Sequence, residues 1–302
     1  MNNVFPVIFS IIIIFFLGVI LRFSNLLKQE DADIFLRIVF YVSLPALILD
    51  NIPAVEINLN YFLLPIICSL IIIISFLVSS LVVRYQKFEA KTQGVFIIGT
   101  MILNLGFNVP FVLGAYGQEG FARATFFDIG NILLVLSLTY YIAQKYGASN
   151  GEEEVSFLNK KLLTSPPLIA LAIGVILNFT GITFDTNVNY LLDLLGGLLT
   201  PLLMLSIGIY FNPKLKRIFP VTQVILTRMG LGLILGIMFT LLLGLDDLSN
   251  KIIIISSAAP VGFNTLTYAS LEELDKEFAA EILSFGIPIG IVTISLLLII
   301  LG

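Results

Sequence analysis

The chain has 302 residues, of which 58% are hydrophobic and 12% are charged, and its formal net charge is −4. Soluble domains are about 45–50% apolar and about 25% charged, so this composition is that of a protein that crosses a membrane several times. The chain has no histidine, which excludes histidine-based triads, histidine proton relays and the usual zinc sites. It also has no Gly-x-x-x-x-Gly-Lys-Ser/Thr loop, which excludes ATP binding by that route.

Apolar runs predict an all-α polytopic membrane protein with ten transmembrane helices, because about 20 helical residues cover the roughly 30 Å apolar core of a bilayer. The first run lacks a preceding basic region, so we interpret it as a span and not as a cleaved signal peptide. In chain order the expected spans are 4–22, 33–51, 61–83, 94–116, 121–144, 162–180, 188–210, 218–243, 251–271 and 278–301.

Spans four and nine are poorly suited to unbroken helices. Span four contains Asn-Leu-Gly-Phe-Asn-Val-Pro at 104–110, and span nine contains Ala-Pro-Val-Gly-Phe-Asn at 259–264. Proline cannot donate a backbone hydrogen bond, and freed backbone groups at membrane depth are tolerated only inside protein or beside a water-filled cavity. We therefore expect both helices to be broken, with Pro110 starting the second half of span four, and Asn264 and Thr265 capping the second half of span nine.

The two interrupted stretches belong to an internal repeat. The tripeptide Gly-Phe-Asn occurs at 106–108 and at 262–264, 156 residues apart, and the same offset maps Pro45 onto Pro201 and 18–23 onto 174–179. Residues 1–146 are the expected first repeat, 147–161 a cytoplasmic connection, and 162–302 the second repeat.

Basic residues predict the orientation of the spans. The odd-numbered connections hold most of them, whereas the other side has only Arg123 and Lys251. By the positive-inside rule the odd connections are cytoplasmic and both termini are extracytoplasmic. Five spans per repeat then make the second repeat inverted in the membrane. The residues that carry this prediction are Arg22, Lys28, Arg84, Lys87, Lys91, Lys145, Lys160, Lys161, Lys214, Lys216, Arg217 and Lys276.

Matched interrupted segments in two halves indicate a transporter binding site. Helix N-termini suit an anion, and unwound carbonyls suit a cation. If the two breaks cross, the amides of Asn104, Asn108 and Asn264 crowd one site; the alternative is that these amides only satisfy the freed backbone. The expected substrate-binding residues are Asn104, Gly106, Phe107, Asn108, Pro110, Pro260, Gly262, Phe263 and Asn264.

Asp128 lies inside span five, and a carboxylate at membrane depth is by default a functional hypothesis. We expect a coupling-ion site at Asp128 with Asn131 and Asn104, taking a proton or a sodium ion; no firm metal site and no other cofactor is expected. The alternative for Asp128 is a structural hydrogen bond to the break in span four. Asp193, Glu281 and Arg228 are nearer span ends, where snorkelling or an ion pair explains each as well as a function does.

A further set of motifs lies at 104–110, 117–120, 127–131, 260–264, Tyr268 and Ala269. In these residues the sequence resembles the auxin efflux carrier family in its short bacterial form, which is similar in architecture to the bile acid/sodium symporters. The resemblance implies two inverted five-helix repeats with spans four and nine crossing at the substrate site. It also implies a scaffold of spans one, two, six and seven, a moving transport domain of spans 3–5 and 8–10, and homodimers.

Family members carry auxin in plants, and bacterial members are regarded as carriers of malate or malonate. We therefore expect a secondary transporter of small organic anions in the cell membrane, and neither an enzyme nor a nucleic-acid-binding protein. The alternatives are a non-transporting sensor or scaffold with a carrier fold, and a cation-only exchanger.

Overall fold

The computed structural model describes residues 4–57, 59–147, 165–211 and 216–302, and its regular elements there are all helices. The expected connection at 147–161, the first residues of span six, and Lys160, Lys161 and Lys214 fall outside these ranges, apart from residue 147 itself.

The first half of the chain forms long helical runs. One run is continuous through a π-helical turn, η1, and a 3-10 turn, η2, and another ends in a second π-helical turn, η3, followed by α7. In order the elements are α1 (Phe5–Phe23), α2 (Gln29–Ile38), η1 (Val39–Ser43), α3 (Leu44–Asn51), η2 (Ile52–Ala54), α4 (Leu59–Arg84), α5 (Ala90–Met101), α6 (Leu105–Leu134), η3 (Val135–Thr139) and α7 (Tyr140–Tyr146).

The second half contains shorter pieces, including a third π-helical turn, η4, between α12 and α13. Its elements are α9 (Pro166–Thr180), α10 (Thr186–Gly197), α11 (Leu199–Tyr210), α12 (Ile218–Ile225), η4 (Leu226–Leu231), α13 (Gly232–Leu243), α14 (Asp247–Ser257), α15 (Asn264–Leu271) and α16 (Lys276–Leu301).

Seven helical runs among the described residues are long and apolar enough to cross a membrane, which confirms an all-helical membrane protein. The runs are Phe5–Phe23, Gln29–Ala54, Asn60–Arg84, Leu105–Tyr146, Thr186–Tyr210, Ile218–Leu243 and Lys276–Leu301. The run Leu105–Tyr146 contains the expected second half of span four and all of span five. Gly117, with φ 61° and ψ −154°, breaks the helical geometry between them, a backbone conformation that favours glycine.

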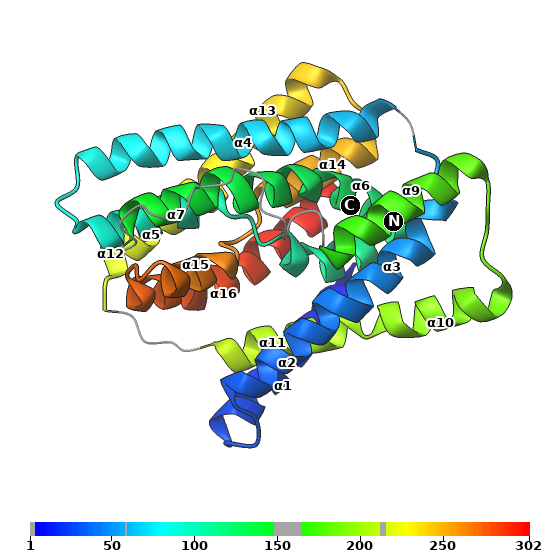
Figure 1. Ribbon diagram of the computed structural model, residues 1–302, viewed down its shortest axis with the longest axis horizontal. Helices are drawn as coiled ribbons and strands as arrows, with labels where there is room; N and C mark the ends of the chain where they lie inside the picture. The colour runs from blue at the N-terminus through cyan, green and yellow to red at the C-terminus, as the bar shows by residue number, and fades with distance from the viewer. Residues whose placement is uncertain (1–3, 58, 148–164, 212–215) are drawn as a thin grey trace.

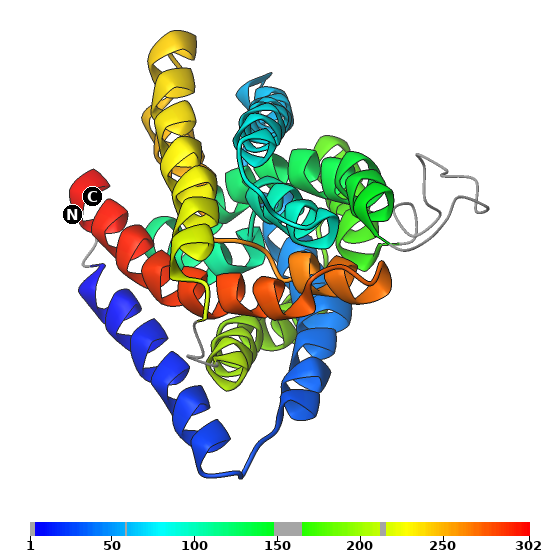
Figure 2. The ribbon, with the colours of Figure 1, turned by 90° about the vertical axis from the view of Figure 1, so that its left-hand side faces the viewer.

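The helices pack in two groups. α1 lies along α11, and α3 packs on α9 and α10, whereas α4 packs on α5 and α6, and α14 packs on α6 and α13. Figure 1 shows α4 running lengthwise over α6, with α1, α2 and α11 on the opposite side. In Figures 1 and 2, α1 begins and α16 ends close together at the same end of the molecule.

Ion pairs join the helix ends of the second group. Arg217 pairs with Asp275 (2.5 Å) and with Glu281 (3.0 Å), so Glu281 is a partner in an ion pair, one of the two roles expected for it. At the other end, Arg123 pairs with Glu119 (2.5 Å) and lies 3.5 Å from Asp246. These pairs tie α6 to the start of α14, and the segment before α12 to α16.

Candidate substrate and coupling site

Two helix interruptions face each other inside the protein. The first separates α5 from α6 at residues 102–104, and the second separates α14 from α15 at residues 258–263. Leu103 and Val261 form an antiparallel β-bridge, in which the Asn104 amide donates to the Pro260 carbonyl (2.9 Å) and the Gly262 amide donates to the Ile102 carbonyl (3.0 Å). Each break therefore satisfies backbone groups that the other has freed, as a buried backbone requires.

The first break lies closer to the N-terminus than we predicted. Gly106, Phe107, Asn108 and Pro110 are all inside α6, which begins at Leu105. The prediction that Pro110 starts the second half-helix is therefore wrong. The Asn104 side chain accepts from the Phe107 amide (3.2 Å) and so starts α6 earlier, since asparagine is a favoured N-cap. Pro110 still has a local effect, because the Gly106 carbonyl has no helical donor four residues on.

Asn131 holds the first break from the side opposite the bridge. Its Oδ1 accepts from the Leu103 amide (3.3 Å), and its Nδ2 donates to the Leu103 carbonyl (3.3 Å). The side-chain amide thus pairs with Leu103 as a neighbouring strand would. Asn131 Nδ2 also donates to Asp128 Oδ1 (2.8 Å), which fixes the orientation of the amide. Asp128 is therefore linked to the break through Asn131, and no hydrogen bond joins Asp128 itself to the break in the described part of the chain.

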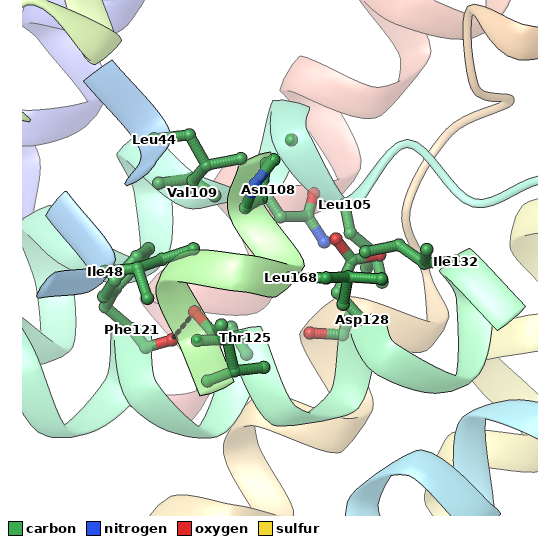
Figure 3. A pocket seen from close by; sticks show the side chains of 15 residues that line it. Leu44, Ile48, Leu105, Asn108, Val109, Phe121, Thr125, Asp128, Ile132 and Leu168 are labelled. Carbon is green, nitrogen blue, oxygen red and sulfur yellow. Dashed lines mark hydrogen bonds between the residues drawn. The ribbon is translucent and has the colours of Figure 1, made fainter. Parts of the chain in front are cut away.

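A cavity lies beside this arrangement, between α6, α3, α9 and the end of α14. Its polar side chains are Asn108, Thr125, Asp128 and Ser256, and its other side chains are apolar. Its empty volume, which includes open solvent at the mouth, is about 510 Å³. Figure 3 shows Asn108, Thr125 and Asp128 around this space, with Leu168 of α9 beside them.

Two buried polar atoms at the cavity lack a protein partner. Asn108 is 1% exposed; its Nδ2 donates to the Ile255 carbonyl (3.1 Å), and its Oδ1 has no hydrogen bond to any described residue. The hydroxyl of Ser256, fully buried, is also without a partner in the described part of the chain. Unpaired buried polar atoms are costly. The Ser256 hydroxyl is suited to donate to a ligand, whereas Asn108 Oδ1, an acceptor, is suited to a donor or a cation.

The second break contributes differently. Asn264 is exposed and is the first residue of α15, and no side chain caps that helix. The buried Thr265 hydroxyl has no partner among the described residues, so the prediction that Asn264 and Thr265 cap α15 is wrong. Asn264 does not line the cavity that holds Asn108, whereas Phe263 lines a second cavity with Tyr210 and Ser284. The two Gly-Phe-Asn sequences therefore place their asparagines in different surroundings.

Arg228 has a role that the sequence did not reveal. It is fully buried in η4, and its guanidinium donates to the carbonyls of Ser257 (2.6 Å), Thr100 (3.2 Å) and Ala259 (3.4 Å). It makes no ion pair with a described carboxylate, so neither of the two roles expected for it applies. A sequence signal existed: Arg228, Gly232 and Gly236 are spaced by four and share one helix face.

Residues 3–298 match a protein family described as membrane transport protein, which is the auxin efflux carrier family. The chain belongs to the auxin efflux carrier family. An uncharacterized transporter of Methanocaldococcus jannaschii is 26% identical over an alignment of 304 positions, which covers 96% of each chain. An uncharacterized transporter of Methanothermobacter thermautotrophicus is 26% identical over 295 residues, which cover 96% of this chain and 95% of its own. This auxin efflux carrier family member is therefore a multi-pass membrane transporter and not a catalytic enzyme.

Proposed function

We propose that this transporter is a secondary carrier of small organic anions, such as mono- or dicarboxylates, with a binding site at the paired breaks. The observation that carries the proposal is the Leu103–Val261 bridge, which lies next to a cavity lined in part by the first turn of α6. Interrupted helices in membrane carriers are where substrates and coupling ions bind, and family membership supports transport.

The chemistry of the cavity favours an anion held by backbone groups. Leu105 and Gly106 line it, and their N–H groups are in the first turn of α6, where no intrahelical acceptor exists. Asn104 caps only the Phe107 amide, which leaves those two N–H groups for a ligand. The helix end adds about half a positive charge. No lysine or arginine is among the described residues that line the cavity.

Asp128 gives the site its ion dependence. A fixed carboxylate on the wall of the cavity opposes an anion, and a proton or a sodium ion on Asp128 removes that opposition. The two ligands then favour each other's binding by the same factor. In this scheme the Ser256 hydroxyl and the second N–H of Asn108 Nδ2 donate to the substrate carboxylate, while Asp128, held by Asn131, takes the coupling ion.

The architecture that we propose is two inverted five-helix repeats, with α1–α3 and α9–α11 as the scaffold and the other helices as a moving domain. The two cavities support it. Ala280 and Ser284 line the second cavity and follow Ala124 and Asp128 of the first by 156 residues, the offset of the sequence repeat. Cavities at equivalent places in two inverted halves provide routes to the two sides of the membrane.

Transport is tested in proteoliposomes with radiolabelled mono- and dicarboxylates, with and without sodium and a pH gradient. We expect saturable uptake by the wild type and none by empty liposomes. Carboxylate binding without uptake across the panel would favour the sensor alternative, and sodium or proton flux that no carboxylate changes would favour the cation exchanger.

Orientation and assembly are further parts of the proposal. The start of α1 and the end of α16 lie at the same end of the molecule. From the distribution of basic residues we infer that this end is on the extracytoplasmic side of the membrane. Reporter fusions after Gly302 should be active only outside the cytoplasm. Light scattering of the detergent-purified protein should give the mass of a homodimer, the assembly implied by the resemblance.

A further inference from the structure

Arg228 lies where the first halves of both interrupted helices end. Thr100 is in the last turn of α5, Ser257 ends α14, and Ala259 lies two residues beyond that end. The carbonyl oxygens of all three accept hydrogen bonds from one guanidinium. The last carbonyls of a helix have no intrahelical donor, and each helix end carries about half a negative charge. Two such ends together match the single positive charge of Arg228.

The neighbourhood is shaped to hold this side chain. A Cβ added to Gly232 would lie 2.1 Å from the Ser257 carbonyl oxygen and 2.5 Å from Arg228 Nη2, so only glycine leaves room for the contact. One turn on, a Cβ at Gly236 would lie 2.8 Å from Ser257 Cβ. Arg228 is also within a π-helical turn, a rare geometry that is frequent at functional sites.

An arrangement of carbonyls from helix C-termini and unwound backbone is the one that carriers with broken helices use for a coupling sodium ion. Here the oxygens already surround a cation that is part of the chain. We propose that Arg228 is a tethered cation in the position of a coupling ion, so that the carrier binds no sodium at the ends of α5 and α14. The inference rests on the proposed function as a carrier, and it leaves Asp128, on the cavity side, as the group for any ion coupling.

The test measures thermal stability of the detergent-purified protein in sodium, potassium or choline chloride at equal ionic strength, without substrate. Asp128→Asn, which removes the carboxylate of the other candidate ion site, is the parent protein for this test, and we expect it to have the same melting temperature in all three salts. Both Arg228 variants are made in this parent. Arg228→Gln removes the charge and leaves space, so we expect a lower melting temperature that sodium raises by roughly 2 °C or more over choline. Arg228→Lys keeps a charge and should lose stability without gaining a sodium effect.

Equal melting temperatures of Arg228→Gln in the three salts would reduce Arg228 to a structural link and overturn the inference. A sodium effect in the Asp128→Asn parent as large as that in its Arg228→Gln variant would also overturn it. Should Arg228→Gln be unrecoverable in every salt, the Asp128→Asn parent decides alone, and any sodium-specific stabilisation of that parent contradicts the inference. The melting temperature is measured without any transport, so its result is independent of the result of the carboxylate uptake assay.

Discussion

Leu103 and Val261, from opposite halves of the chain, pair as an antiparallel bridge that joins the two interrupted helices. Leu103 is held on its other side by the amide of Asn131. The extended backbone at residues 102–104 thus has protein hydrogen-bonding partners on both of its sides. This pairing accounts for two breaks coexisting at one place, since either break alone would leave backbone donors and acceptors unpaired.

The glycines of the two Gly-Phe-Asn sequences should respond unequally to alanine. A Cβ at Gly262 would lie 2.6 Å from Ile102 Cγ2 and 3.1 Å from the Leu103 oxygen, whereas a Cβ at Gly106 would meet nothing within 4 Å. We expect Gly262→Ala to cost about 1–3 kcal/mol of stability, as overpacking does, and Gly106→Ala to keep the fold. Thermal unfolding in detergent measures both, and equal melting temperatures would contradict this asymmetry between the breaks.

The two asparagines should also differ. Asn108→Ala removes an amide that lines the cavity, so we expect carboxylate uptake to fall at least about tenfold, a loss of about 1.4 kcal/mol, in a protein that remains folded. Asn264→Ala removes an exposed side chain outside that cavity and should have a smaller effect. Initial uptake rates in proteoliposomes check this, with gel filtration as the control for folding. A larger loss from Asn264→Ala would move the substrate site to the second break.

Asp128→Asn should weaken or abolish the dependence of transport on pH or sodium while leaving anion binding partly intact. The amide keeps an oxygen to accept from Asn131 but loses the charge that opposes the substrate. Thr125→Val is the matched control, because it changes the same cavity wall without changing charge. Uptake is measured across a pH series with and without sodium. An unchanged ion dependence in Asp128→Asn would make Asp128 structural.

Acid should destabilise the end of the protein at α16. Burial alone would raise the pKa of Asp275, but hydrogen bonds from Arg217, the Phe278 amide and Thr92 hold its pKa below the usual value. Its contribution to stability is therefore complete above about pH 4, its unfolded pKa, and is lost as pH falls through the lower folded pKa. Below about pH 4 the wild-type melting temperature should fall more steeply than that of Asp275→Asn. Parallel curves would show that the ion pair contributes nothing measurable.

Much of the protein is determined by local sequence. The length of the apolar runs and the scarcity of charge are enough to predict an all-helical membrane protein, because backbone groups inside a bilayer must form their hydrogen bonds within the helix. The glycines and prolines near 106 and 262 likewise predict interruptions, and the repeat of Gly-Phe-Asn predicts that the two belong together. The motif residues are also sufficient to predict the family, and the comparison with known proteins confirms that prediction.

The tertiary structure decided which residues do what at the breaks. Asn104 rather than Pro110 starts α6, Asn131 pairs with Leu103, and the two asparagines of the repeated tripeptide occupy unlike surroundings. Arg228 had no predictable partner, because its three carbonyls come from two segments distant in sequence and carry no side-chain signature. Every residue carries the same backbone carbonyl. Sequence can therefore show where a helix will break, but only packing shows what satisfies the groups that the break frees.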